Sequence, residues 1–154
     1  MPEASSGEHD VRQAAIDLLE ATGRFDAVYH YSAPEDRGQS SGDLRAAVVS
    51  AVKGDYSQPW DDVTAGRPLC RHTFNVVVMA RDDDPAIRDR AADSLAAVVR
   101  NTLDGVSLAG LTFVQQTLVT GSVWLPERPP ERQVRLTVST AYEAPDFNSF
   151  NTSE

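Results

Sequence analysis

The chain has very little cysteine, since Cys70 is the only one among its 154 residues. An intrachain disulfide is therefore excluded, which is typical of proteins that fold in a reducing compartment. Long apolar runs are also missing, because no stretch approaches the ~18 consecutive apolar residues of a membrane-spanning helix. The opening residues MPEASSGEHD lack the basic start and apolar run of a signal peptide. We expect no membrane partner.

Basic residues are scarce as well. The chain has 14 Lys and Arg against 23 Asp and Glu, giving a net charge of -9. Affinity for nucleic acid comes mostly from basic side chains that displace counterions from phosphates, so tight binding of this kind is disfavoured. An acidic surface would still let DNA slide past without sticking. Simple solubility is the alternative explanation of the same charge.

Composition and length predict one ordinary domain. Apolar residues make up 41% of the chain and charged residues 24%, close to globular averages. We place a flexible N-terminus at residues 1–9, a single domain at 10–143 and an extended C-terminal tail at 144–154. Phe147 and Phe150 are unusual in so polar a tail, and we expect them to dock on a neighbouring subunit or on the parent core.

Hydrophobic periodicity predicts two helices. The first spans residues 11–22, with Asp10 as its N-cap and Gly23 after its end. The second begins at Pro85 behind the N-cap Asp84 and ends before Gly105. Its predicted buried stripe is Ile87, Ala91, Leu95, Val98, Val99 and Leu103. Its predicted water-facing residues are Arg88, Asp89, Asp93 and Arg100.

Strands are predicted at residues 25–31, 44–53, 71–80, 111–120 and 133–142. The segment 44–53 could also form a helix, but its valines favour a strand. The strand 71–80 is apolar on both faces, which indicates cover on both sides or a partner on one. The last two strands should form an antiparallel hairpin with a wide turn around Pro126. The predicted fold is α+β, a mainly antiparallel sheet with two helices packed on it.

Candidate catalytic groups are few. Asp82, Asp83 and Asp84 could hold a cation, but they lack the alternating spacing and turning glycine of a calcium loop, and capping accounts for Asp84. Cys70 and His72 could be half a zinc site or a nucleophile pair. A structural zinc needs four ligands, and residues two apart on one strand rarely come within hydrogen-bonding reach.

His30 is interpreted as an interface or solvent residue, and Trp60 beside two aspartates as an aromatic anchored in a loop. Nucleotide-binding glycine loops, the G-x-S-x-G elbow and H-E-x-x-H are all missing from the sequence. We therefore expect no catalytic residue, no cofactor and no metal.

Three long polar segments, 32–43, 54–70 and 121–132, carry both tryptophans and several prolines. Loops made rigid by proline and bearing aromatic residues are good contact surfaces, because they lose little entropy on binding. Plain loop decoration is the alternative. The candidate interface residues are Trp60, Trp124, Pro126, Phe147 and Phe150.

Several segments together resemble the tail terminator and tail-completion proteins of long-tailed bacteriophages. They are VRQAAIDLLEATG, TFNVVVMARDDDP with the helix after it, NTLDGVSLAGLTF, the turn WLPERPPER and the alternating last strand. The similarity covers residues 10–143 and rests on the order of the elements more than on invariant residues. The 54–70 loop and the extended C-terminus depart from the compact pattern of this family.

The resemblance implies a structural virion protein that is not an enzyme. It implies a homo-oligomeric ring, usually a hexamer, that caps the tail tube and joins it to the head connector. DNA would pass through the lumen without specific binding. The protein would reside in the tail or neck of the virion after assembly in the host cytoplasm. A head-completion or other neck subunit is the alternative, followed by a small enzyme using Cys70 and His72 or the acids at 82–84.

Overall fold

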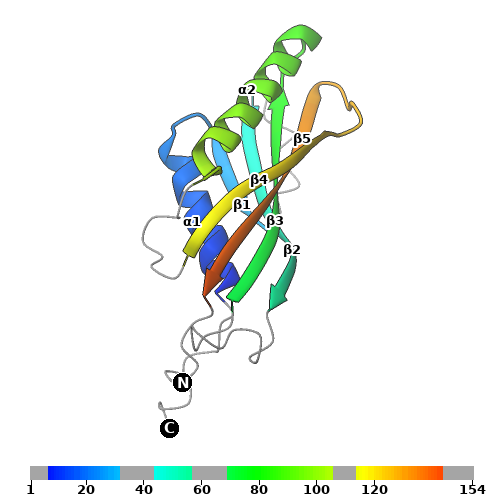
Figure 1. The fold of residues 1–154 in the computed structure, drawn as a ribbon. Helices are drawn as coiled ribbons and strands as arrows, with labels where there is room; N and C mark the ends of the chain where they lie inside the picture. Colours follow the sequence, from blue (N-terminus) through cyan, green and yellow to red (C-terminus); the bar gives the residue numbers. More distant parts are fainter. Residues whose placement is uncertain (1–6, 32–43, 57–68, 106–113, 144–154) are drawn as a thin grey trace.

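A computed structural model describes residues 7–31, 44–56, 69–105 and 114–143 (Figure 1). Trp60, Phe147 and Phe150 lie outside these ranges. The elements in chain order are α1 (Glu8–Ala21), β1 (Ala27–His30), β2 (Leu44–Tyr56), β3 (Leu69–Arg81), α2 (Pro85–Leu103), β4 (Val114–Trp124) and β5 (Glu131–Glu143). The predicted α+β class with two helices is confirmed, and 44–53 is a strand. Neither helix in the described part of the chain is long and apolar enough to cross a membrane.

The five strands form one sheet in the order β1-β2-β3-β5-β4. β1 runs parallel to β2, and every other neighbouring pair is antiparallel. β3 lies at the centre of the sheet, as its apolar sequence indicated. The last two strands form the predicted antiparallel hairpin. β1 and β4 are the two edges, and each presents backbone groups on one side that no strand of this sheet pairs.

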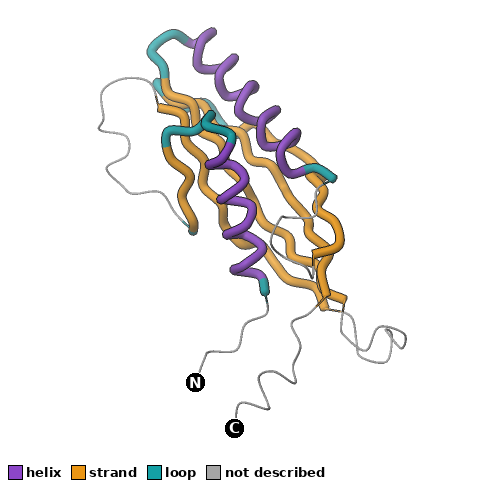
Figure 2. Tube along the Cα trace, turned by 90° about the vertical axis from the view of Figure 1, so that its left-hand side faces the viewer, coloured by secondary structure: helices purple, strands orange, loops and turns teal. Residues whose placement is uncertain are grey.

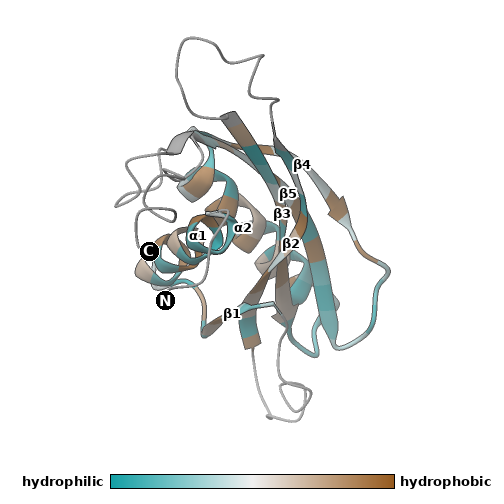
Figure 3. Cartoon of the chain, turned by 90° about the horizontal axis from the view of Figure 1, so that it is seen from below, coloured by the Kyte–Doolittle hydropathy of each residue, from teal (hydrophilic) through white to brown (hydrophobic). Residues whose placement is uncertain are grey.

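Both helices pack on the same face of the sheet, as the rotated views show (Figures 2 and 3). Alternation along the strands explains the arrangement, because successive side chains point to opposite faces. On β3, Phe74, Val76 and Val78 point to the helices and are fully buried. Val77, on the opposite face, is only half-buried, so the helices cover one face of this strand and not both.

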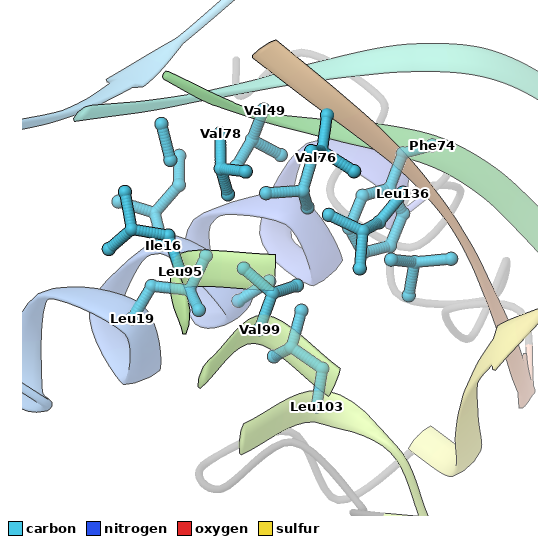
Figure 4. Close-up of a cluster of buried hydrophobic side chains, with 14 of the residues drawn as sticks. Ile16, Leu19, Val49, Phe74, Val76, Val78, Leu95, Val99, Leu103 and Leu136 are labelled. Atoms are coloured by element: carbon cyan, nitrogen blue, oxygen red, sulfur yellow. The ribbon is translucent and has the colours of Figure 1, made fainter. Parts of the chain in front are cut away.

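The core lies between the two layers (Figure 4). Ile16 and Leu19 of α1 and Leu95, Val99 and Leu103 of α2 face Val49, Phe74, Val76, Val78 and Leu136 of the sheet. Burying each large aliphatic side chain contributes about 1.5–3 kcal/mol before conformational entropy is subtracted. The predicted inward residues of β5, which are Val134, Leu136, Val138 and Tyr142, are all buried.

The start of α1 differs from the prediction. The helix begins at Glu8, and its N-cap is Gly7 rather than Asp10. Gly7 has a φ of 89°, a left-handed conformation that glycine adopts without steric cost, and its carbonyl accepts a bond from the Val11 N–H. Asp10 instead lies in the first turn, where its charge suits the positive end of the helix dipole. Gly23 follows the helix end with a φ of 69°, as expected.

The start of α2 and the predicted burial of Ala91, Leu95, Val99 and Leu103 are confirmed, but the predictions for Ile87 and Arg88 are wrong. Asp84 caps the helix by accepting a bond from the Ala86 N–H at 2.9 Å, and Pro85 is its first residue. Ile87, predicted to be buried, is 45% exposed. Arg88, predicted to face water, is 4% exposed. The buried stripe begins with Arg88, Ala91, Ala92 and Leu95, so only the first turn of the helix faces the sheet differently from the prediction.

Four strands extend beyond the predicted bounds, whereas β1, predicted at residues 25–31, is shorter and spans only Ala27–His30. β2 continues to Tyr56 and β3 begins at Leu69, so the predicted loop 54–70 loses residues at both ends. The predicted turn 121–132 shrinks to 125–130, because Trp124 ends β4 and Glu131 begins β5. Pro126 lies in that turn as predicted. Ladder hydrogen bonds with the central strands extend these segments beyond the apolar residues from which they were recognised.

Candidate assembly surface

The tip of the β4–β5 hairpin presents an exposed tryptophan. Trp124 is 41% exposed, and the guanidinium of Arg132 lies 5.0 Å from the centre of its ring. Cation–π contacts of this kind hold the ring in one orientation. Pro126 is exposed in the adjoining turn. Of the five candidate interface residues, these two are described, and the structure places them together at the hairpin tip.

Two ion pairs attach this hairpin to α2. The buried Arg88 donates to Glu127 Oε1 at 2.5 Å, and Arg132 Nε lies 3.5 Å from Asp89 Oδ1. The hydrogen bond from Arg88 lowers the pKa of the Glu127 carboxyl, with a smaller opposing effect from burial. Trp124, the last residue of β4, therefore adjoins a turn that is fixed to α2. This limits the entropy that the tryptophan loses when it binds a partner.

The edge strand β4 adds apolar surface on the sheet face away from the helices. Leu118 pairs with Ser139 and Val123 pairs with Arg135, and both partners point away from the helices. Leu118 is 40% exposed and Val123 is 50% exposed. The residues that end α2 bond to β4 at one place, where the Gly105 N–H donates to the Thr117 carbonyl and the Val119 N–H donates to Asp104 Oδ1. Exposed apolar side chains on an edge strand are features of surfaces that meet another chain. Trp124 pairs with Val134, a core residue, so its side chain lies on the other face of the same strand. We call Leu118, Val123, Trp124 and Pro126, which follow one another along β4 and its turn, the β4 surface.

A buried polar cluster joins α1 to the sheet. Arg12, only 6% exposed, donates from Nη1 to His72 Nε2 at 2.8 Å and from Nε to His30 Nε2 at 3.0 Å. The other ring nitrogen of His72 lies 2.9 Å from the Lys53 carbonyl oxygen. Because arginine only donates and a carbonyl only accepts, His72 is the neutral tautomer with its proton on Nδ1.

Burial is the main cause that lowers the pKa of both His72 and His30. Arg12 lowers both pKa values further, whereas the Lys53 carbonyl and Glu8 act in the opposite direction on His72. The two rings are thus hydrogen-bond acceptors for Arg12 at neutral pH. Through these contacts they join α1 to the sheet.

A surface stack adjoins this cluster. His30 stacks on Tyr31 with ring centres 3.9 Å apart, and His9 lies against His30 at 4.8 Å. His9 Nδ1 is also 2.6 Å from the Tyr31 hydroxyl. Tyr31 has a φ of 76°, unusual for a bulky residue, and its N–H donates to the Val49 carbonyl. All three histidines of the chain therefore lie around Arg12.

Sequence reasoning missed the buried arginines, although a signal was present. Arg12 precedes Ala15, Ile16 and Leu19 at helical spacing. Arg88 precedes Ala91, Ala92 and Leu95 in the same way. An arginine one turn before a buried stripe lies on the same face of the helix. The imidazole partners come from distant strands and the carboxylate partner from a distant turn, and no local pattern reveals them.

The candidate catalytic groups do not form a site. Cys70 and His72 are both buried, and burial raises the pKa of the Cys70 thiol, which disfavours the nucleophilic thiolate. Both nitrogens of His72 are engaged by Arg12 and Lys53. Asp84 caps α2, and Asp82 accepts a bond from the Asp84 N–H. Within the described ranges, no three His, Cys, Asp or Glu side chains are grouped so as to hold a metal ion.

No protein-family model and no curated protein sequence matches the chain. Among solved structures, the fold matches a chain of the "Virion of native gene transfer agent (GTA) particle" with a TM-score of 0.61. The match covers 90% of this chain and 99% of that chain, at 19% sequence identity. The two chains share a fold. Because the whole of the other chain is matched, the likeness includes the order of helices and strands and not one motif alone.

Proposed function

We propose that this protein is a structural subunit of a phage-type virion, a tail terminator that forms a ring, most simply a hexamer. The ring caps the finished tail tube and joins it to the head connector, and DNA passes through its lumen without specific binding. The protein acts by contacts between surfaces and carries out no chemical reaction.

The observation that carries the proposal is the fold shared with a component of a gene transfer agent virion over nearly the whole of both chains. The order of helix, strands, long helix and hairpin that resembles tail terminators is the same order that the structure displays. The net charge of -9 suits a channel through which DNA moves without adhering.

The β4 surface supports self-association. It combines an edge strand of the described sheet, two exposed aliphatic residues and an oriented tryptophan on a fixed hairpin. Closed rings need heterologous contacts, in which one surface of a subunit meets a different surface of the next. We assign the β4 surface to one side of that contact.

Light scattering coupled to size-exclusion chromatography tests the proposal, with the purified protein measured alone and mixed with the tail tube protein of the same particle. We expect a closed ring in at least one of these conditions, visible as an annulus by electron microscopy. A strict monomer in both conditions contradicts the proposal. Association with the head connector but not with the tail tube protein would instead support a role as a neck subunit.

A further inference from the structure

A groove opens between the end of α1, the start of β2 and the outer side of α2. Its volume is about 420 Å³. The α2 wall includes the apolar residues Ile87, Leu95 and Val98 beside the polar Arg90 and Ser94. Ile87 is 45% exposed, so a large aliphatic side chain is left uncovered on this wall. The groove therefore offers a place for another apolar side chain.

Three arginines line the same groove, namely Arg24, Arg45 and Arg90. The described residues supply no carboxylate partner to any of their guanidinium groups. The Arg45 Nη1 atom is buried without a hydrogen-bond acceptor. A buried guanidinium N–H without an acceptor is costly, so this position favours a ligand that supplies one. Three uncompensated arginines are notable in a chain whose net charge is -9.

The occupant that fits is a short acidic segment with large apolar side chains. Carboxylates pair with guanidinium groups through strong charge-assisted hydrogen bonds, and aromatic rings stack on them. The chain contains such a segment at residues 144–154. It carries Asp146, Glu154, Phe147 and Phe150, and it has no lysine or arginine.

The register of the sheet decides which copy can supply that segment. Arg45 lies opposite Ala80, and Ala80 lies opposite Arg132. β5 continues eleven residues beyond Arg132 to Glu143, a distance of about 36 Å at ~3.3 Å per residue. The tail therefore starts at the opposite end of the sheet from the arginines.

A chain cannot bring its own phenylalanines to this end. Phe147 is four residues beyond Glu143 and Phe150 is seven, so fully extended they reach about 14 and 25 Å. Both values fall short of ~36 Å. A neighbouring subunit has no such restriction.

We propose that the groove receives the segment around Asp146, Phe147 and Phe150 from a second copy of this chain. The acids pair with Arg24, Arg45 and Arg90, and one phenylalanine packs beside Ile87. Each subunit in a ring then holds the tail of the next. The inference rests on the proposed self-assembly and adds a specific contact to it.

Photo-crosslinking in the full-length chain tests the contact. A Phe147→p-benzoylphenylalanine variant at natural isotope abundance is mixed with ¹⁵N-labelled unmodified chain, irradiated, digested and mapped by mass spectrometry. The expected product joins the light tail to a heavy peptide from residues 87–98. A product with light peptides only, a product at a different surface, or no product overturns the inference.

Charge reversal in the heavy chain sharpens the test. Arg24→Glu together with Arg90→Glu should lower the yield of this product about tenfold or more, because each lost charge-assisted pair is worth roughly one factor of ten. The single variant Arg90→Glu should also lower the yield, and Arg100→Glu is its matched control, since it reverses one charge on the same helix outside the groove and should retain the yield. Equal yields from both variants contradict the assignment.

Light scattering on the same samples separates this inference from the proposed function. A ring without the crosslink refutes the tail contact and leaves the ring in place. The crosslink in a dimer, without a ring in the presence of tube protein, supports the contact and refutes the terminator role.

Discussion

Arg12 Nη1 lies 2.8 Å from His72 Nε2, in a contact between α1 and the central strand β3 that requires the imidazole to be neutral. Protonation would replace the acceptor with a second donor facing a guanidinium. Glu8 Oε1 is 3.8 Å from His72 Nδ1 and would offset part of that charge. The attachment of α1 to the sheet therefore depends on pH.

Stability should fall on acidification. The pKa values of His72 and His30 are lowered in the folded chain, so the unfolded chain takes up protons first as the pH drops below about 6.5. The contribution of the two neutral histidines to the free energy of unfolding is complete above that pH. It is lost as the pH falls through their lowered pKa values in the folded chain. Urea unfolding at pH 8, 7, 6 and 5 measures it.

His72→Gln is the control for that measurement. Glutamine can accept from Arg12 and donate to the Lys53 carbonyl, but it does not titrate. The variant should show a flatter dependence of the free energy of unfolding on pH between 5 and 7. Identical slopes for the two proteins would rule out His72 as the titrating group.

The cap of α2 should be worth a measurable amount. Asp84→Ala removes the acceptor of the Ala86 N–H and should lower the free energy of unfolding by about 0.5–2 kcal/mol. Asp83→Ala, the neighbouring exposed aspartate, is the matched control and should change stability by less than about 0.5 kcal/mol. Chemical denaturation of both variants and the unchanged protein measures these free energies of unfolding. Equal losses would indicate a general charge effect at the helix start.

The pair between Arg88 and Glu127 should behave asymmetrically. Arg88→Ala removes a buried stem as well as a charge, so it should lower the Tm more than Glu127→Gln, which leaves an amide at a half-exposed position. The double variant should lose less in Tm than the two single losses added together, since each single change already removes the ion pair and leaves one partner unpaired. Thermal unfolding of the four proteins gives the coupling. Strict additivity would mean that the ion pair contributes nothing.

The β4 surface predicts a specific assembly defect. Val123→Glu should weaken association of subunits about tenfold or more while leaving the Tm unchanged, because the residue is exposed in the isolated subunit. Val52→Glu is the matched control, since Val52 is 51% exposed against 50% for Val123 but lies on an interior strand. Sedimentation equilibrium measures the association constant of subunits for both variants. An equal effect of both substitutions would remove the β4 surface from the contact.

Local patterns were sufficient for the elements and their order. The Asp84–Pro85 start of α2, the alternation along β5 and the valines of β2 each express a preference contained within a few neighbouring residues. Pairing within the sheet extended the strands beyond those patterns, because ladder hydrogen bonds do not depend on the side chain.

The amino-acid sequence by itself determined an α+β domain with two amphipathic helices, a mainly antiparallel sheet and an acidic surface. Only the tertiary structure decided that Arg12 meets His72, that Arg88 is buried against Glu127 and that Arg24, Arg45 and Arg90 share a groove. The physical reason is that such contacts join residues far apart in the chain. Their free energy arises from burial and from the pairing of charges, and neither exists until the helices have packed on the sheet.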